Sequence, residues 1–481
     1  FCPVHNLQFT FRWDKPLAQY CSACDKEWIG NNRYDWAWIY EVHMLNRDYM
    51  YQCMYLYLAT GKRQYADYIR TMLLDYAGKY AGWFEHNSGR KATDQHSGKA
   101  FAQSLDEANW ATKVAMAYVA IKPVLSKEEV KAIEEGYLQP AATLLLHRPA
   151  GANWQMWHNS GLAALGIALE NDSIVDVAIN KDKYGYHYLI GKHKNSDGWI
   201  NEGSPHYHYY PLEALLFTAN AVKCRGIKLF DKDLHDMFVE PVKGTYPDLS
   251  FPAHSDGWYG ANLLSQSALY EVGNARYNDP FLKRVLELTY AQKKRLDPEA
   301  LLSNQLIKAS EESLLQKSYS FDTSGFCLLR SDTRTVVLKF GGEGIGHGHP
   351  DKLSITIHDG KNELVSDFGT SGYGVPDYLK WYKRTLSHNT VTVDAKDQKR
   401  SVGKLLKFNP RSDGGYAEAE TTTAYPGVRM KRSLDLKGTH LQDVYTCTSD
   451  SSHLYEYVIL FNEKPLMDGQ PTATTLTGSE V

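Results

Sequence analysis

The residues of this chain best suited to chemistry lie at positions 346–351, which read Gly-His-Gly-His-Pro-Asp. His347 and His349 flank a glycine there, and Asp367 and His388 follow, each beside a strand-like run. Imidazole and carboxylate groups in this combination bind zinc or serve as a general acid–base pair. Side chains two residues apart in an extended segment point the same way, so one metal ion could take both histidines. Alternatively, His349 binds the metal and His347 faces a cleft.

The spacing of His349, Asp367 and His388 predicts a three-ligand zinc site. A hydrogen-bonded polar cluster at a domain interface is the alternative that spacing leaves open.

A second stretch, residues 197–210, runs from a Gly- and Pro-bearing loop into a helix. It ends in two histidines and three tyrosines within five residues, His206 and Tyr207 among them. A tyrosine can move a proton if a nearby cation or donor lowers its pKa from about 10. Packing at a helix start explains Tyr209 and Tyr210 better than it explains Tyr207.

A third stretch places polar and aromatic groups at the start of an apolar helix, at Asn153, Trp154, Gln155 and His158. Amide groups at a helix N-terminus can bind a carboxylate, and the helix dipole favours it. Alternatively, Asn153 only caps the helix.

Two further pairs lie near the start of the chain, Cys2 with His5 and Cys21 with Cys24. Each has the two-residue spacing with which a tight turn grips zinc, so the four residues predict a small structural zinc knuckle. A Cys21–Cys24 or Cys2–Cys21 disulfide, or free thiols, are the alternatives. Seven cysteines in 481 residues do not indicate a disulfide scaffold.

Helical patterns from Arg33 to about Lys293 and short alternating runs after Ser320 position these residues. They predict an α+β multidomain protein, with an N-terminal (α/α) toroid followed by a C-terminal antiparallel β-sandwich. The predicted domains are residues 1–30, 31–300 and 318–481, the last one possibly truncated. The expected helices are Tyr34–Thr60, Arg63–Tyr80, Leu105–Ile121, one from a capping box at Ser126 past Leu145 that is strained at Pro140, Trp154–Leu169, Ile174–Ile190, Pro211–Val222, Gly260–Tyr270 and Pro280–Gln292. The expected strands are Phe326–Leu329, Thr335–Phe340, Leu353–His358, Glu363–Ser366, Thr390–Val393, Ser433–Leu436 and Leu454–Phe461.

Composition bounds the partners of the protein. A net charge of −3 without a block of basic residues argues against a nucleic-acid surface. No run reaches the roughly 18 apolar residues of a membrane helix. The 33 Tyr and 11 Trp fit large helical cores and sugar binding about equally. A start at Phe1 without methionine or signal peptide fits a processed periplasmic or secreted protein, and also any shortened chain.

The motifs His-Gly-His-Pro-Asp, Asp-Phe-Gly and Ser-His-Asn-Thr-Val resemble those of the heparinase II/III-type polysaccharide lyases, which include alginate lyases. The stretches around Asn153 and Tyr207 resemble the same family's toroid motifs. The resemblance implies an (α/α) toroid followed by a β-sandwich. It implies that Tyr207 and His347 are catalytic, that Asn153 neutralises the substrate carboxylate, and that zinc sits on His349, Asp367 and His388. The expected substrate contacts are Trp154, Gln155, His158, His206, Tyr373 and Arg384.

The implied reaction is β-elimination on a 4-linked uronic acid in an acidic polysaccharide. His347 or Tyr207 would take the C5 proton, and Tyr207 would protonate the leaving O4. Zinc would fix the loop that carries His347 without polarising the substrate.

Trp154 stands where several alginate-cleaving members have histidine, which favours heparin or heparan sulfate over alginate, chondroitin or ulvan-type glycans. The arginines considered for sulfate or carboxylate binding are Arg33, Arg90 and Arg384.

Three rival functions fit parts of the sequence. A glycoside hydrolase on the same toroid would use paired carboxylates. A non-catalytic glycan-binding protein would need the aromatic residues but not His347. A zinc hydrolase would activate water on the three-ligand site. The carboxylates considered for the hydrolase are Asp106, Glu107, Asp197 and Glu202.

Overall fold

The structure is a computed structural model, and it divides into two compact units. The first comprises Phe1–Leu189 and Ala214–Leu229, and the second comprises Ile190–Glu213 and Phe230–Val481. The residues that it describes are 2, 4–5, 7–30, 32–88, 96–302, 305–311, 314, 317–342, 344, 346–373 and 375–466.

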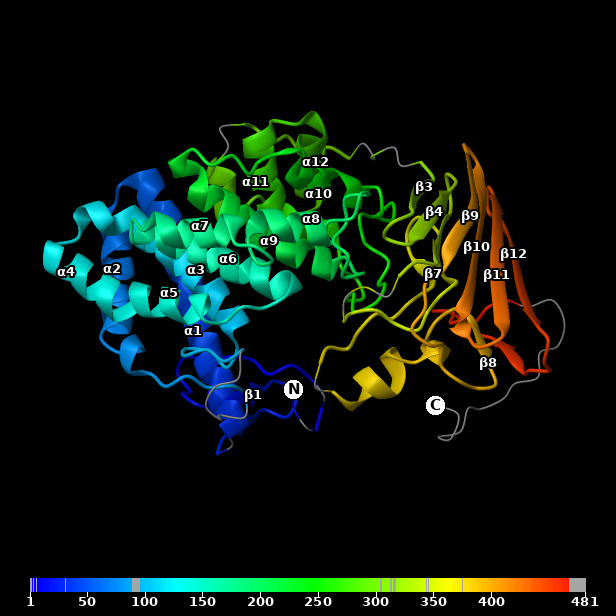
Figure 1. The fold of residues 1–481 in the computed structure, drawn as a ribbon, viewed down its shortest axis with the longest axis horizontal. Coiled ribbons are helices and arrows are strands. Elements are labelled where there is room, and N and C mark those ends of the chain that lie inside the picture. Colours follow the sequence, from blue (N-terminus) through cyan, green and yellow to red (C-terminus); the bar gives the residue numbers. More distant parts are fainter. Residues whose placement is uncertain are drawn as a thin grey trace. The chain divides into compact units, whose positions relative to one another are not determined.

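The first unit is built from helices that pack pairwise along the chain (Figure 1). Helix α3 lies against both α1 and α6, and its Trp110 and Tyr118 are fully buried. The aromatic richness of the sequence therefore serves a helical core in this unit. The elements are β1 (Gln19–Cys21), β2 (Lys26–Trp28), α1 (Asn32–Thr60), α2 (Arg63–Ala77), α3 (Ser104–Ile121), α4 (Lys127–Ile133), α5 (Gln139–Leu146), α6 (Ala152–Ala168) and α7 (Asp172–Asn180), together with parts of α8 (Tyr186–His193) and α9 (His206–Val222).

The helix predicted from Ser126 onward is present but interrupted. The capping box is confirmed, because the Ser126 hydroxyl accepts from the Glu129 amide while the Glu129 carboxylate accepts from the Ser126 amide. A π-helical turn, Glu134–Leu138, separates α4 from α5. Pro140 lacks an N–H and its ring would clash with the preceding turn of an α-helix, so the wider turn relieves the strain that the sequence predicted.

Three predicted helices have the wrong bounds. The helix predicted at Pro211–Val222 begins at His206. The span Ile174–Ile190 is two helices, α7 and α8, because residues 181–185 form a turn in which Lys183 has a positive φ of 65°. The helix predicted at Gly260–Tyr270 begins only at Ser267. The sequence also missed α10, where Asp231 caps the first turn by accepting from the Leu234 amide.

The second unit continues with helices and then changes to strands. Its further helices are α10 (Lys232–Val242), α11 (Ser267–Tyr277) and α12 (Pro280–Gln292). Its strands are β3 (Tyr319–Phe321), β4 (Phe326–Arg330), β5 (Thr335–Lys339), β6 (Ser354–His358), β7 (Glu363–Val365), β8 (Val391–Val393), β9 (Lys404–Arg411), β10 (Gly414–Tyr425), β11 (Val428–Lys437), β12 (His440–Ser449) and β13 (Tyr455–Tyr457). The order of helices before strands agrees with the prediction.

The strands form two antiparallel layers. The larger sheet has the order β12-β11-β10-β4-β5-β6-β7, with β3 paired to β4, and the smaller one pairs β8 with β13. Val391 and Val393 of β8 share one apolar core with Val336 and Leu338 of β5. That shared core makes the two layers a sandwich. The sequence missed β3, β9, β10 and β12. Strand β3 has only three residues, and polar residues in β9, β10 and β12 weaken the apolar alternation.

The buried Arg432 of β11 ties the site-bearing segments to this sandwich. Its guanidinium donates to the carbonyl oxygens of Leu353 (2.7 Å) and Asn389 (2.6 Å) and forms a two-point contact with Asp443. Leu353 follows the Gly-His-Gly-His-Pro-Asp segment and Asn389 follows His388. One buried, fully satisfied cation thus fixes both segments on the same sheet.

Gly369 of the Asp-Phe-Gly motif allows the loop of residues 253–258 to approach its backbone closely. Its φ is +59°, and a Cβ there would lie 1.9 Å from the carbonyl oxygen of Gly257. The Thr370 amide donates to that same oxygen (3.0 Å). The motif therefore holds residues 253–258 against the strand ends, and a side chain at position 369 would push them away.

We predict that Gly369→Ala lowers the free energy of unfolding by about 1–3 kcal/mol more than Gly438→Ala does. Gly438 has nearly the same φ, +58°, but a Cβ there meets nothing within 4 Å. The two variants share the conformational cost and differ only in the close approach. Chemical denaturation measures both, and equal losses would contradict the role given to Gly369.

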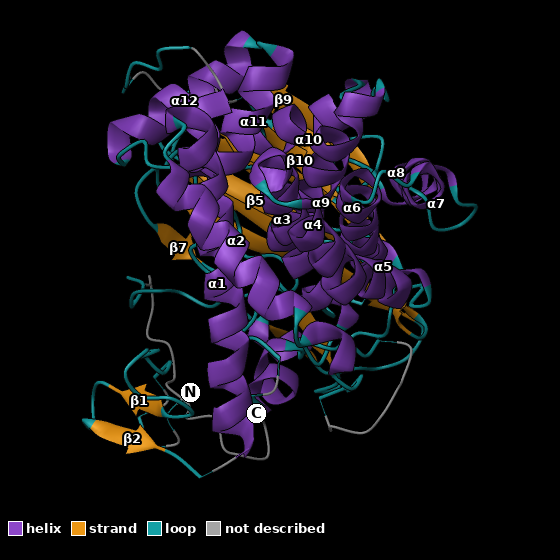
Figure 2. Cartoon of the chain, turned by 90° about the vertical axis from the view of Figure 1, so that its left-hand side faces the viewer, coloured by secondary structure: helices purple, strands orange, loops and turns teal. Residues whose placement is uncertain are grey.

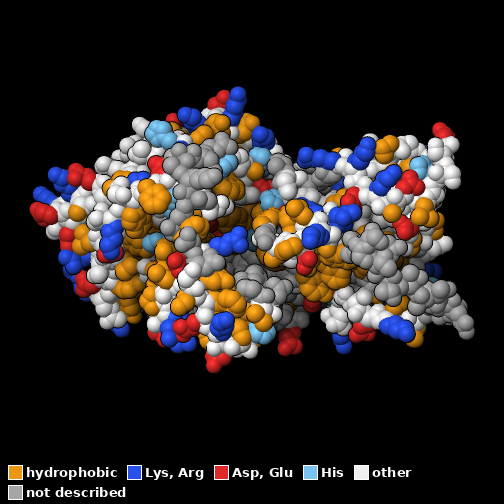
Figure 3. All heavy atoms as spheres, turned by 90° about the horizontal axis from the view of Figure 1, so that it is seen from below, with side chains coloured by type: hydrophobic (Ala, Val, Ile, Leu, Met, Phe, Trp, Pro, Cys, Tyr) orange, Lys and Arg blue, Asp and Glu red, His pale blue; other side chains and the backbone are white. Residues whose placement is uncertain are grey.

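On the face seen in Figure 3, basic and acidic side chains lie intermingled. Among the described residues, no helix combines the length and the apolar character needed to cross a membrane.

Candidate active site

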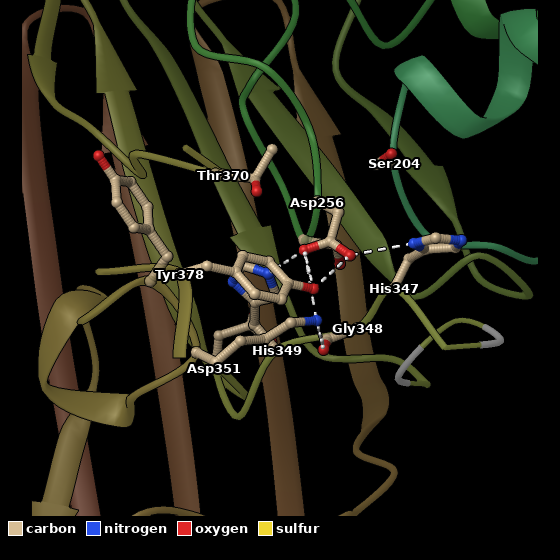
Figure 4. Close-up of polar contacts among 12 residues, drawn as sticks. Ser204, Asp256, His347, Gly348, His349, Asp351, Thr370 and Tyr378 are labelled. Atoms are coloured by element: carbon tan, nitrogen blue, oxygen red, sulfur yellow. Dashed lines mark hydrogen bonds and ion pairs between the residues drawn. The ribbon is translucent and has the colours of Figure 1, made fainter. Parts of the chain in front are cut away.

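The centre of the site in the second unit is Asp256, a residue that sequence reasoning missed. Its side chain is fully buried in the loop after α10, and its amide donates to the carbonyl oxygen of His347 (3.0 Å). Figure 4 shows its carboxylate between His347 on one side and Tyr378 and His349 on the other. Oδ2 lies 3.0 Å from His347 Nδ1, and Oδ1 lies 2.9 Å from His349 Nε2.

Three more groups complete the surroundings of this carboxylate. The hydroxyls of Tyr373 and Tyr378 donate to Oδ2, each at 3.0 Å, and Lys383 Nζ lies 3.3 Å from Oδ1. Burial alone would raise the pKa of Asp256, but the two histidines and the Lys383 charge hold it well below its usual range. Asp256 is therefore an anion that only accepts hydrogen bonds.

The anionic Asp256 orders the hydroxyls around it. Tyr373 gives its one proton to Asp256, so the Tyr207 hydroxyl, 2.6 Å from that of Tyr373, donates to Tyr373. The His347 Nδ1 atom lies 2.9 Å from the Tyr373 oxygen and carries a proton toward these acceptors. A continuous hydrogen-bonded chain thus joins Tyr207 to the carboxylate.

Tyr207 also lies directly against His347. Their rings stack with centroids 3.5 Å apart and planes 16° apart. Tyr207 stands in the first turn of α9, where its amide donates to the Ser204 hydroxyl (3.2 Å). Burial, with the charges of Asp256 and Glu202 adding to it, raises the pKa of Tyr207 to about 12, so the phenol is protonated at neutral pH. The sequence predicted that Tyr207 and His347 lie together, and the geometry brings them into contact.

The residues around His388 form a candidate metal site. One ligand atom each from Asp351, Asp367 and His388 lies within 4.8 Å of the others, and all three side chains are buried. His349 is not in this group, although its ring centroid is 5.2 Å from that of His388. Asp351 is already paired with the ammonium groups of Lys339 and Lys352. The geometry therefore adds Asp351 to the predicted set and leaves the third ligand open between it and His349.

Hydrogen bonding prepares both histidines to bind a metal. Because ionised Asp256 accepts from Nε2 of His349, the Nδ1 atom keeps its lone pair. His388 likewise directs Nδ1 at Asp367 (3.0 Å), which leaves Nε2 with a lone pair. His349 Nδ1 and His388 Nε2 are buried, and neither has a hydrogen-bond partner among the described residues. Two such nitrogens beside a buried carboxylate fit the donor set of zinc.

The predicted residues outside this cluster have other surroundings. Asn153, Gln155 and His158 are buried on α6 in the first unit, and Trp154 of that helix contacts His96. The Gln155 side chain bonds the Ala150 amide and Asn159. The structure gives these residues no test of substrate binding, so their roles remain predictions.

In the second unit, His206 stacks on Tyr210 and lies beside Tyr207. Arg384, expected to bind sulfate or carboxylate, donates with its Nε to Asp397 (2.6 Å). Arg90 lies outside the described residues.

The carboxylates considered for hydrolysis have polar partners, and Asp106 accepts from the Tyr40 hydroxyl (3.4 Å). Glu107 accepts from the amides of Lys99, Ala100 and Phe101, and Asp197 accepts from both the amide and the hydroxyl of Ser324. Glu202 is buried with Oε2 3.7 Å from His347 Nε2. These contacts assign Glu107 and Asp197 to loop structure.

Sequence similarity divides the chain into two matched regions. Residues 42–240 match the alginate lyase family, and residues 314–465 match the heparinase II/III-like C-terminal family. An alginate lyase of Stenotrophomonas maltophilia is 29% identical over 88% of this chain and 63% of its own length. An exo-oligoalginate lyase of Saccharophagus degradans is 26% identical over 89% of the chain and 64% of its own length. A heparin-sulfate lyase of Bacteroides stercoris is 26% identical over 50% of the chain and 35% of its own length. The chain thus spans less than two thirds of each relative.

A solved heparinase III structure superimposes with a TM-score of 0.63 at 16% identity, covering 92% of this chain and 69% of that one. This similarity confirms the predicted fold class, an (α/α) toroid followed by an antiparallel β-sandwich. With the two family matches, it also confirms the resemblance to the heparinase II/III-like polysaccharide lyases.

We predict that Asp256→Asn weakens zinc binding at the His388 cluster by about 10–100-fold. The neutral amide no longer satisfies both histidines, and it places an N–H group among donors. Competition with a chromophoric chelator measures the affinity of each bound zinc ion, and only the ion at the His388 cluster should be held more weakly in the variant. Asp413→Asn is the matched control, since its carboxylate lies beside the half-exposed Arg411 and, among the described residues, outside the His388 cluster. An Asp256→Asn affinity equal to that of the control would contradict the assignment.

Proposed function

We propose that this protein is a polysaccharide lyase that cleaves 4-linked uronic-acid glycans by β-elimination. The observation that carries the proposal is the contact of a protonated Tyr207 with His347 over the buried Asp256 carboxylate. An acid and a base held side by side suit a reaction that removes one proton and delivers another. The two family matches, to alginate lyase and heparinase II/III-like domains, support the same class.

The residues divide the reaction between them. His347 takes the C5 proton on Nε2, because its Nδ1 is committed to Asp256 and Tyr373. The electron pair left at C5 forms the C4=C5 double bond as the C4–O4 bond breaks. O4 leaves with the proton of Tyr207. Asp256 stabilises the imidazolium of His347, and Tyr373, which contacts both groups, offers a path for the proton to return to Tyr207.

Asp256 acts as a positioning residue in this proposal. It fixes the orientation of His347 and, through His349, connects that histidine to the candidate metal site. We propose zinc there, held by Asp367, His388 and His349 Nδ1, because the carboxylate of Asp351 already has two lysine partners. Bound zinc would supply rigidity to the loop that carries His347.

For the substrate, two observations favour an unsulfated uronate such as alginate. The relatives that align with 88% and 89% of the chain are named alginate lyase and exo-oligoalginate lyase. Arg384, expected to meet sulfate, is bound to Asp397. Heparan sulfate is the second candidate, favoured by Asn153-Trp154 and by the heparin-sulfate lyase that aligns with half of the chain. Because such polymers do not cross membranes, we place the protein in the periplasm or outside the cell.

Replacement of Tyr207 by Phe tests whether Tyr207 is the general acid that protonates O4. We predict that Tyr207→Phe lowers kcat by about 10²–10⁴-fold, since the ring still stacks on His347 but has no proton to give. Formation of the ultraviolet-absorbing unsaturated product measures the rate, and the unfolding temperature should stay near that of the wild type. Tyr416→Phe, whose hydroxyl bonds Glu418 on the same strand, is the control. A Tyr207→Phe enzyme as active as this control would refute the mechanism.

A panel of polymers and their oligosaccharides tests the substrate. We expect new ultraviolet absorbance with alginate and little with heparin, heparan sulfate, chondroitin or ulvan. Absorbance with heparan sulfate alone would select the second candidate. New reducing ends without absorbance would indicate a hydrolase, and binding without any product would indicate a glycan-binding protein. Either of the last two results would overturn the proposal. Asn153→Ala, assayed on the active polymer, tests the predicted carboxylate contact separately.

A further inference from the structure

The four residues singled out near the start of the chain come together in the first unit. One ligand atom each from Cys2, His5, Cys21 and Cys24 lies within 4.8 Å of all the others. His5 Nδ1 is 3.8 Å from the sulfurs of both Cys2 and Cys21, and the sulfurs of Cys2 and Cys24 are 3.9 Å apart. This set lies outside both matched regions, 42–240 and 314–465, and outside the site described above.

The separations are those of a metal site and not of a disulfide. A disulfide requires sulfurs about 2.05 Å apart. Zinc bound tetrahedrally at about 2.3 Å from sulfur and 2.0–2.1 Å from nitrogen holds its ligand atoms roughly 3.5–3.8 Å from one another. The distances found here, 3.8–3.9 Å, match that tetrahedron, and all seven cysteines are free.

Local folding explains how the ligands converge. Strands β1 and β2 pair antiparallel with Cys21 opposite Lys26, so Cys24 falls in the tight turn between them. Asp25 adopts a positive φ of 49° in that turn. The Cys2 amide donates to the carbonyl oxygen of Leu7 (2.7 Å), and this bend places His5 beside Cys2. Two bends that each present a pair of ligands are the usual construction of a zinc knuckle.

The segment also lacks another means of holding its shape. Among its described residues up to position 30, only Cys2, Ala18, Gln19 and Cys21 are buried, while apolar side chains such as Val4 and Ile29 are 68% exposed. A segment this short cannot bury enough apolar surface to fold on its own, and a metal often replaces the missing core. Two of the four buried residues are the thiols themselves.

The segment rests on the first helix of the unit. Figure 2 shows the β1–β2 hairpin beside the foot of α1. Phe11 stacks on Trp38 with ring centroids 5.7 Å apart, and the Trp38 indole donates to the Arg12 carbonyl oxygen (3.1 Å). The side-chain amide of Gln19 donates to the Tyr34 carbonyl oxygen (3.3 Å). Ordering of the hairpin therefore fixes the start of α1.

We propose that Cys2, His5, Cys21 and Cys24 bind one structural zinc ion, which clamps residues 2–30 and supports the start of α1. Three thiolates and one imidazole fill a tetrahedral shell and leave no position for substrate or water, so the ion takes no part in catalysis. The inference does not depend on the proposed lyase activity.

Cobalt substitution of the full-length protein tests the site without an activity assay. The His388 cluster contains no sulfur, so thiolate-to-cobalt charge-transfer absorption reports the amino-terminal site alone. We expect this absorption in the wild type and in Cys224→Ser, a control at an exposed free thiol. It should disappear in Cys21→Ser, with the loss of one zinc per chain by elemental analysis and a lower unfolding temperature.

If the Cys21→Ser protein fails to fold, two further measurements test the site without it. His5→Cys should keep the metal and increase the charge-transfer absorption, because a fourth thiolate replaces the imidazole. In the wild type, titration with a thiol-specific mercurial should release one zinc per chain as the knuckle thiols react. Cobalt-loaded wild type without charge-transfer absorption would overturn the proposal. So would an intact mass lower by two hydrogens with a Cys21–Cys24 or Cys2–Cys21 peptide crosslink.

Discussion

The buried charge of Asp256 is the constraint on which the rest of the second-unit site depends. An unpaired carboxylate without exposure to water would be costly, and here two imidazoles, two phenols and one ammonium offset that cost. Each donor is fixed in orientation by the same anion. One charge thereby sets the tautomers of His347 and His349 and the direction in which the Tyr207–Tyr373 chain donates.

This arrangement links two parts of the site that the sequence shows separately. The motif's two histidines face opposite oxygens of one carboxylate, so His347 is directed to the tyrosines and His349 is left with a free lone pair on Nδ1. In the proposed mechanism, metal binding and proton transfer then depend on the same carboxylate. The loop bearing Asp256 reaches this position because Gly369 lets it approach the strand end. Arg432 holds the segments that carry His349 and His388 by donating to the carbonyl oxygens of Leu353 and Asn389.

The order of helices and strands could be predicted because periodicity carries that information. The partnership of Tyr207 with His347 was predicted only through the resemblance to the lyase family, since the two residues lie 140 positions apart. Asp256 was missed since it lies in an irregular loop without a motif, and only tertiary contacts reveal its five donors. The available signal in the sequence was an acid between His254 and Gly257, and many solvent-exposed loops have the same composition. Asp351 was passed over because its lysine partners come from β5 and from the adjacent residue. Strands β9, β10 and β12 were missed because frequent polar residues weaken the alternation of apolar and polar positions.

The most direct test of the account is an anomalous-diffraction map at the zinc absorption edge from crystals of the zinc-loaded protein. The account predicts a peak bonded to Nδ1 of His349, to His388 and to Asp367, with Asp256 still bridging His349 Nε2 and His347 Nδ1. A peak bonded to Nε2 of His349, or an Asp256 side chain turned away from both histidines, would contradict it.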